Sequence, residues 1–415
     1  MTPDDVDLSD LGLFAPGAPW DSFRVLREQS PVHWNPEPAP NRGFWSLTRQ
    51  ADIVAVGRDD ATYSSEQGAV NLEELDDAQL EMRKSMLETD GARHWALRRL
   101  LQRDFTARSL AGYETFLRGL TATTLDAAFA QGEFDFVKAV SADYPIRVLV
   151  RLMDVPDEMG DQFIKWSNRL VGNTDPDYAD VLLGSKESEQ YRDLPFRSPA
   201  ALEVFAYGDS LARERKGGDG TDLVSKLVNQ TPEDGIPLSE RDFHTYFLLL
   251  VAAGNETTRH TLSHTMRALI EHPEAMEQLR VRPELLPVAV EEFLRWASPV
   301  YHFRRTATRD HELHGQQIRA GDKVVMWYAS GNRDESVFDA PDVFDIERAN
   351  NDHVTFGKGG PHFCLGNQLA RLEVRIMIEE ILRRGVRVEL DGTIEHVRSN
   401  FIHGIKQFPV RVSAA

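Results

Sequence analysis

The chain has 415 residues, 41% hydrophobic and 27% charged, a composition typical of globular proteins that excludes collagen-like and largely disordered ones. Its 47 basic and 66 acidic residues give a formal charge of −19 at pH 7, which disfavours nucleic acids and anionic membranes as partners. The sequence shows neither a targeting segment nor an apolar run of about 20 residues, so we expect a cytoplasmic protein without a membrane span.

Short β-strands are predicted near both termini, with a helical body between them. Segments 31–34 and 43–48 are rich in aromatic and β-branched residues, and similar segments return after Val300. Helical periodicity dominates in between. With no convincing linker or repeat, the sequence predicts one domain over 1–415, mainly α with a smaller β region. We expect β-rich parts at about 30–50, 300–330 and 386–415, and a helical body at about 51–298 and 365–384.

The longest predicted helix lies between a capping pattern at Ser239 and Pro273. Its middle, 247–253, is apolar all round, which indicates burial. Gly254 and Glu256 follow directly, although a glycine inside a helix costs about 1 kcal/mol and a buried charge needs a partner. We therefore expect a functional reason for these two residues.

The only cysteine, Cys364, follows a glycine-rich loop and precedes a predicted helix that Gly385 ends. A lone cysteine is more often an inert buried thiol, but a helix N-terminus favours the thiolate, the form that ligates metals. The spacing does not match a nucleotide-binding loop, and His362 with Cys364 supplies only two zinc ligands. A single axial thiolate to a haem iron fits this loop.

The segment Phe356–Gly366 resembles the haem-thiolate loop of the cytochrome P450 family, and further family motifs stand in the family's order. Residues 94–98 resemble its H-x-x-x-R, and Arg305 its propionate-binding arginine. Residues 253–257 resemble the oxygen-activating segment of the central helix. Residues 292–295 resemble the family's E-x-x-R, with Arg348 as the third member of an ion triad.

The resemblance implies a cytochrome P450 fold, with haem b between the long central helix and the helix after Cys364, the axial iron ligand. It implies proton-delivering, catalytic roles for Glu256 and Thr257 and a structural triad of Glu292, Arg295 and Arg348. The cofactor-binding residues that it implies are His94, Arg98, Ala253, Gly254, Arg305, Phe356, Gly357, His362, Cys364 and Gly366.

Each motif also has an ordinary interpretation. Glu292 and Arg295 alone would be a solvated helix pair, and Thr257 alone would bond back to its own helix. One departure from the family also stands out, since Cys364 is eight positions after Phe356 where seven are common. The longer loop resembles a bacterial subgroup acting on sterol side chains and methyl-branched lipids.

The predicted function is therefore a haem-dependent monooxygenase that hydroxylates a hydrophobic sterol, terpenoid or branched lipid with O2. Electrons are expected from a ferredoxin with its NAD(P)H-dependent reductase, docked on Arg99, Arg103, Lys358, Arg371 and Arg375. The predicted substrate pocket contains Leu249, Val300, Phe303, Phe401 and Ile402. The alternatives are a natural-product tailoring hydroxylase, a peroxide-dependent peroxygenase and a haem-thiolate sensor without turnover.

Overall fold

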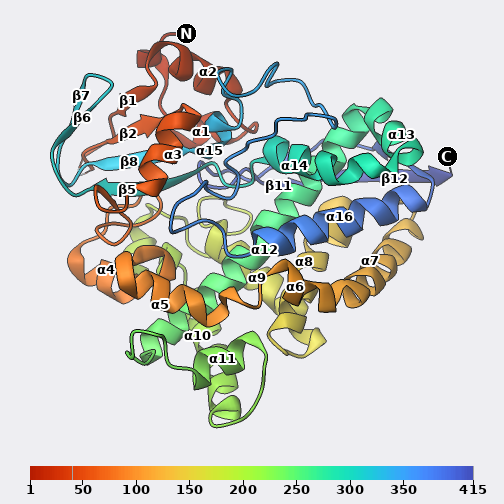
Figure 1. Ribbon diagram of the computed structural model, residues 1–415, viewed down its shortest axis with the longest axis horizontal. Coiled ribbons are helices and arrows are strands. Elements are labelled where there is room, and N and C mark those ends of the chain that lie inside the picture. Colours follow the sequence, from red (N-terminus) through yellow and green to blue (C-terminus); the bar gives the residue numbers. More distant parts are fainter. Residues whose placement is uncertain (40, 415) are drawn as a thin grey trace.

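The computed structural model describes residues 1–39 and 41–414, and its sheets and helices occupy different parts of the molecule (Figure 1). The N-terminal helices and a five-stranded sheet lie at the upper left of the view, and helices fill the centre and the lower half. The helices beside the sheet are α1 (Leu11–Phe14), α2 (Trp20–Gln29), α3 (Gln50–Arg58) and α15 (Tyr328–Gly331). The other helices are α4 (Asp77–Arg83), α5 (Gly91–Gln102), α6 (Ala107–Leu110), α7 (Glu114–Phe129), α8 (Asp143–Leu152), α9 (Gly160–Val171), α10 (Ala200–Arg215), α11 (Leu223–Asn229), α12 (Glu240–Glu271), α13 (Pro273–Val281), α14 (Leu286–Ala297) and α16 (Asn367–Arg383).

The largest sheet joins segments from both halves of the chain in the order β1-β2-β8-β5-β3. Strand β2 pairs in parallel with β8 and the other neighbours are antiparallel, with Trp34 opposite Trp45 in the β1–β2 hairpin. Its strands are β1 (Val32–Asn35), β2 (Phe44–Leu47), β3 (Tyr63–Ser64), β5 (His302–Ala307) and β8 (Lys323–Trp327). The smaller sheets contain β4 (Glu133–Asp135), β9 (Val386–Leu390) and β12 (Pro409–Ala414), then β6 (His311–Leu313) with β7 (Gln316–Ile318), and β10 (Glu395–His396) with β11 (Ile405–Gln407).

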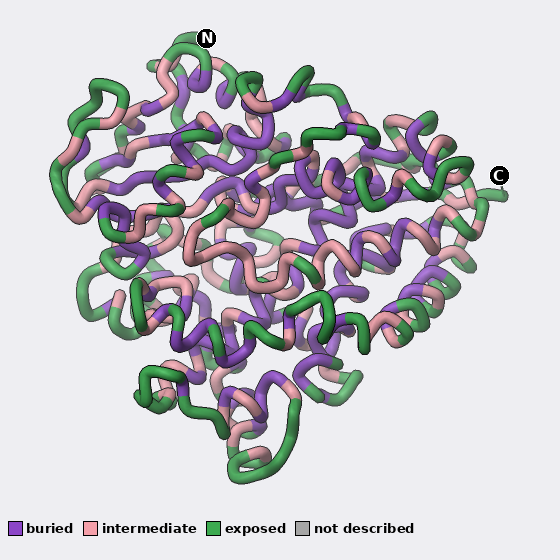
Figure 2. Tube along the Cα trace, in the orientation of Figure 1, coloured by how far each residue is buried: buried purple, intermediate pink, exposed green. Residues whose placement is uncertain are grey.

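The predicted long helix is α12, which crosses the middle of the molecule (Figure 1). Ser239 accepts the backbone N–H of Asp242 and the Asp242 carboxylate accepts that of Ser239, so the expected capping box is formed. The helix ends at Glu271, before Pro273 starts α13. Because helices and strands surround it, most of α12 is buried, as the purple centre of Figure 2 shows.

Two short strands lie inside the segment 51–298 that we expected to form the helical body. β3 pairs with β5, and β4 pairs with the C-terminal β12, where Phe134 lies opposite Val410. These strands have two or three residues, too few to show an alternating pattern. Their partners, far away in the sequence, decide their conformation. Among the described residues, no helix combines the length and apolar character that a bilayer crossing requires.

Candidate active site

The loop before α16 holds Cys364 beside a helix end. The Cys364 N–H donates to the Phe356 carbonyl at 2.9 Å, and Gly357 has a φ of +66°, which permits the turn between them. Gly366 caps α16. Burial raises the pKa of the Cys364 thiol, although the Gly366 N–H and the positive charge of Arg98 act in the opposite direction. Coordination to a metal ion would replace the thiol proton, so the expected thiolate ligand is compatible with this environment.

The longer loop is accommodated against the end of α3. A Cβ on Gly360 would lie 1.9 Å from the Gly57 carbonyl oxygen, so the loop backbone touches the backbone of α3. Gly359 has a φ of +71° and lies against the Arg58 guanidinium. Both positions therefore require glycine. Most of the loop, residues 355–358 and 360–367, is half-buried, the pink band in front of the purple centre in Figure 2.

Three predicted cofactor-binding side chains, His94, Arg98 and His362, lie in or around this loop. His94 is fully buried and its two ring nitrogens lie 3.0 Å from the carbonyl oxygens of Met86 and Pro361, so a direct bond to a cofactor would have to replace one of these contacts. Arg98 donates to the Phe363 carbonyl. The centroid of the His362 ring lies 4.0 Å from that of the His94 ring, and burial lowers the pKa of His362 to about 4.

The buried side chains of Arg98, Arg305 and His362 form a cluster that suits an anionic ligand. Within the part of the chain that the structure describes, Arg98 and Arg305 are buried yet form no ion pair with a carboxylate, and the Nδ1 atom of His362 has no hydrogen-bond partner. Buried cations without a counter-charge are costly, so a ligand with carboxylates is expected to complete this cluster. The donor set fits haem propionates, with Cys364 as the iron ligand.

The central helix α12 carries two further predicted site residues, Ala253 and Thr257. Ala253 is exposed, and Leu249 and Thr257 on the same helix face are partly exposed, so a space adjoins the helix there. The Thr257 hydroxyl donates to the Ala253 carbonyl at 3.0 Å, the ordinary back-bond of a helical threonine. A Cβ on Gly254 would lie 3.3 Å from Leu149 of α8, so close helix packing explains this glycine. Its contact with a cofactor stays a prediction.

Glu256 is the centre of a buried hydrogen-bonded network. Its carboxylate accepts from Ser167 of α9 at 3.0 Å, from Arg259 at 3.1 Å and from His260 at 3.0 Å. The Nδ1 atom of His260 accepts the Ile405 N–H, so the His260 proton is on Nε2 and points to Glu256. Although burial alone would raise it, the pKa of Glu256 falls to about 2 through Arg259 and His260. The buried charge therefore has its partners and is ionised at neutral pH.

A cavity lies between α12 and the segments that follow β3 and α9. All five predicted pocket residues, Leu249, Val300, Phe303, Phe401 and Ile402, line it together with Ala253 and Thr257. The sequence did not indicate Val171, Pro195 and Phe196, which also line the cavity. Phe196 has a φ of +58°, a left-handed conformation for which the sequence gives no signal.

The structure brings Glu292, Arg295 and Arg348 together away from solvent. Arg295 donates twice to the Glu292 carboxylate, at 2.7 and 2.8 Å, and Arg348 donates once at 3.2 Å. Glu292 and Arg295 are completely buried. The interpretation as a solvated surface pair therefore does not apply, and the three residues connect α14 with the segment before the Cys364 loop.

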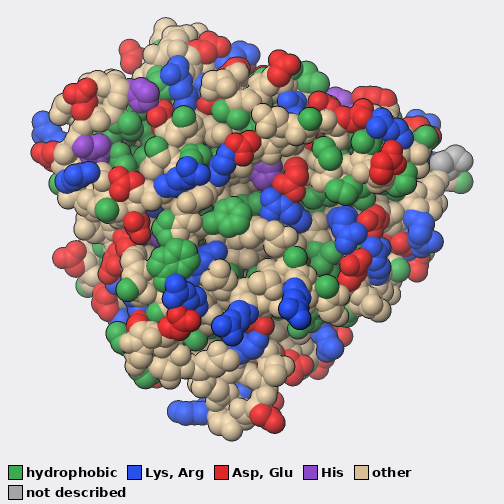
Figure 3. Space-filling model, in the orientation of Figure 1, with side chains coloured by type: hydrophobic (Ala, Val, Ile, Leu, Met, Phe, Trp, Pro, Cys, Tyr) green, Lys and Arg blue, Asp and Glu red, His purple; other side chains and the backbone are tan. Residues whose placement is uncertain are grey.

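The basic side chains expected to dock an electron donor are mostly paired with acids. Arg99 lies 2.6 Å from Glu233, Arg371 2.7 Å from Glu291 and Arg375 3.0 Å from Glu379, and Lys358 pairs with Asp352. Within residues 1–39 and 41–414, only Arg103 of the five has no ion pair. Figure 3 accordingly shows basic and acidic side chains interspersed over the face that α16 crosses. The expected basic patch is therefore largely neutralised.

A buried acid on α16 provides a pH-dependent prediction. Glu373 is 2% exposed, and burial raises its pKa from 4.5 to about 8. In the unfolded chain this carboxyl ionises above its ordinary pKa of 4.5, whereas in the folded protein it stays protonated up to about pH 8. The folded state therefore loses stability as the pH rises between these two values. Glu373→Gln is therefore expected to stabilise the protein by about 3 kcal/mol more at pH 7.5 than at pH 5, measured by urea unfolding.

The control for this prediction is Glu379→Gln, on the same helix but half-exposed and paired with Arg375. Its effect on stability is expected to be small at both pH values. A pH-independent effect of Glu373→Gln would show that Glu373 is ionised in the folded protein.

Comparisons with known proteins agree with the site. A family model described as Cytochrome P450 matches residues 206–393. A steroid C26-monooxygenase of Mycolicibacterium smegmatis is 34% identical, over 100% of this chain and 95% of that protein. A methyl-branched lipid omega-hydroxylase of Mycobacterium tuberculosis is 35% identical, over 94% and 90%. A crystallised cytochrome P450 of Mycobacterium marinum in complex with pseudoionone has a TM-score of 0.85 and 37% identity, over 94% of each chain.

The chain belongs to the cytochrome P450 family. The predicted fold class and enzyme class are thereby confirmed: the protein is a haem-thiolate monooxygenase with the cytochrome P450 fold and acts on a hydrophobic substrate with O2.

Proposed function

We propose that this protein hydroxylates the hydrocarbon part of a sterol, terpenoid or methyl-branched lipid, using haem b and a ferredoxin-type electron donor with an NAD(P)H-dependent reductase. The observation that carries the proposal is the cavity between α12 and the segments that follow β3 and α9, because its lining is predominantly apolar. The relatives support the substrate class, since two of them are described as acting on steroids and branched lipids. The cytoplasmic location stays a prediction.

The residues around the cofactor have different roles in the reaction. Haem supplies the activation of O2 when bound, and Cys364 would hold its iron while Arg98, Arg305 and His362 hold its carboxylates. The apolar side chains of the cavity position the substrate and exclude water.

We assign proton delivery to Thr257, with Glu256 as the acid that passes protons on to it. The Thr257 hydroxyl lines the cavity, and the ionised Glu256 one residue earlier also reaches the cavity wall. An ionised carboxylate passes protons on by first accepting them from water, and Arg259 and His260 hold Glu256 in the ionised form that accepts them. The presence of Glu256 and Thr257 favours a monooxygenase over a peroxygenase, because a peroxygenase does not need this pair.

The test is turnover of the haem-loaded protein with a surrogate ferredoxin system and a panel of sterols, terpenoids and branched lipids. We expect at least one compound to shift the spin state of the iron and to yield a hydroxylated product. In Thr257→Ala the product formed per NADPH should fall at least about tenfold while peroxide rises, because proton transfer contributes factors of that size or more.

Thr261→Ala is the matched control, since Thr261 makes the same backbone bond one turn later, to the Thr257 carbonyl at 2.8 Å. Its coupling should equal that of the wild type. A panel without any spin-state shift or product would refute the substrate class, whereas unchanged coupling in Thr257→Ala would refute only the proton role.

A further inference from the structure

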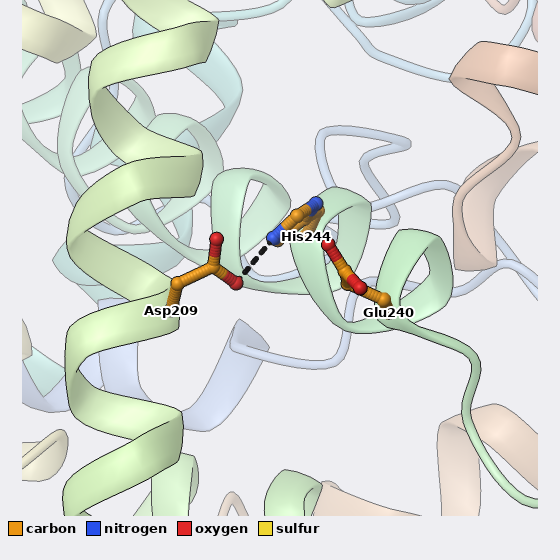
Figure 4. Close-up of side chains that lie close together, drawn as sticks. All are labelled: Asp209, Glu240 and His244. Carbon is orange, nitrogen blue, oxygen red and sulfur yellow. Dashed lines mark hydrogen bonds and ion pairs between the residues drawn. The ribbon is translucent and has the colours of Figure 1, made fainter.

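Three potential metal ligands meet on the surface between α10 and the first turns of α12 (Figure 4). Asp209 comes from α10, and Glu240 and His244 come from α12. One ligand atom of each lies within 4.8 Å of the others, and His244 Nε2 is 2.6 Å from Asp209 Oδ1. Glu240 and His244 are four residues apart on a helix, a spacing that puts both side chains on one face.

The packing of His244 fixes its orientation. Its ring stacks on Phe205 of α10, with centroids 4.7 Å apart and an angle of 11° between the planes. The His244 side chain is 14% exposed, whereas Glu240 is exposed. Two sides of the group therefore belong to well-packed helices and the third is open to water, which can complete a coordination sphere.

The charge of the group favours a cation. Among the described residues, Asp209 pairs only with His244, and Glu240 has no ion-pair partner. The adjacent Arg241 pairs with Glu81 instead. Among the described residues the two carboxylates thus lie beside one imidazole without an ion pair to a lysine or arginine, and the nearby Arg213 donates to the Asp209 backbone carbonyl instead, so a divalent ion can compensate both charges.

We propose that Asp209, Glu240 and His244 form a surface site for Zn²⁺ or a similar transition-metal ion, separate from the haem site. One imidazole nitrogen and two carboxylates are ligands that zinc accepts, whereas Ca²⁺ and Mg²⁺ prefer oxygen ligands alone. On binding, the ion takes the place of the proton between His244 Nε2 and Asp209, and the ring keeps one proton on Nδ1, so the ligand is the neutral imidazole.

Such an ion joins α10 to α12. Pro195 and Phe196, shortly before α10, line the substrate cavity. The ion therefore connects the segment beside the cavity with the central helix. Because the three ligands come together only in the folded chain, binding stabilises the folded state.

The experiment is calorimetric titration of the haem-loaded protein with Zn²⁺, with Cys364 occupied by iron. We expect about one ion per chain in the wild type, and binding at least about tenfold weaker in His244→Asn and in Glu240→Gln. The control is His314→Asn, because His314 lies 2.8 Å from Asp52 in a similar surface pair but has no third ligand. This control should bind Zn²⁺ as the wild type does.

Thermal unfolding gives an independent measurement on the same proteins. Zn²⁺ should raise the unfolding temperature of the wild type and of His314→Asn but not of the two site variants, and equal Mg²⁺ should have no effect. Zinc binding that both site variants retain, or that His314→Asn also loses, would overturn the proposal. Absence of zinc binding by the wild type would overturn it as well. None of these outcomes depends on the substrate or the electron donor.

Discussion

Replacing Cys364 with alanine is expected to abolish the red-shifted Soret band of the reduced carbonyl complex, together with all monooxygenase activity. The chain has one cysteine, so no other thiolate can take its place at the iron. His362, two residues earlier, has a free ring nitrogen, and a histidine ligand would give a different spectrum. The measurement is the carbonyl difference spectrum of the purified variant, with the haem content determined separately.

Lys358→Gln is the control for this change, because Lys358 lies in the same loop and pairs with Asp352 away from the sulfur. It should retain both the thiolate spectrum and the haem. A thiolate-type spectrum in Cys364→Ala, or a wild-type protein that stays colourless after reconstitution with hemin, would contradict the assignment of the iron ligand.

Replacing Glu292 with glutamine is expected to lower the free energy of unfolding by about 3–5 kcal/mol, or to prevent folding. The Glu292 carboxylate accepts hydrogen bonds from Arg295, Arg348 and Asn351 and from the Asp345 N–H. Neutralising it leaves two buried guanidinium groups without a counter-charge. Urea unfolding of the haem-loaded protein, or the yield of folded protein, measures the effect.

The adjacent Glu291 offers a matched comparison on the same helix. It accepts two hydrogen bonds from Arg371 and one from His353 but is 30% exposed, so Glu291→Gln should cost less than Glu292→Gln. If both substitutions destabilise the protein to the same extent, the triad has no special structural importance.

Much of the fold could be predicted because the signals were local. The capping box at Ser239, the apolar middle of α12 and the glycine after α16 depend on residues within a few positions of one another. The strands β1, β2, β8 and β9 likewise have enough β-branched or aromatic residues to be identified. β3 and β4 are too short for such a signal, and their distant partners define them.

The sequence indicated which types of residue belong to the candidate site, but not which contacts they make with one another. Family motifs indicated Glu256 and Thr257, but only the structure shows that Arg259 and His260 keep Glu256 ionised. The residues expected to dock an electron donor are basic by type, but their acidic partners, such as Glu233 and Glu291, come from elsewhere in the chain.

The sequence by itself determined which residue can ligate the iron, because there is one cysteine and its loop and helix are encoded within about thirty positions around it. Only the tertiary structure decided how the charges are balanced and what shapes the cavity. Phe196 reaches the cavity wall through a left-handed backbone, and Asp209 meets His244 across two helices. The physical reason is that hydrogen bonds of helices and turns join neighbours in sequence, whereas ion pairs and cavity walls join residues that only folding brings together.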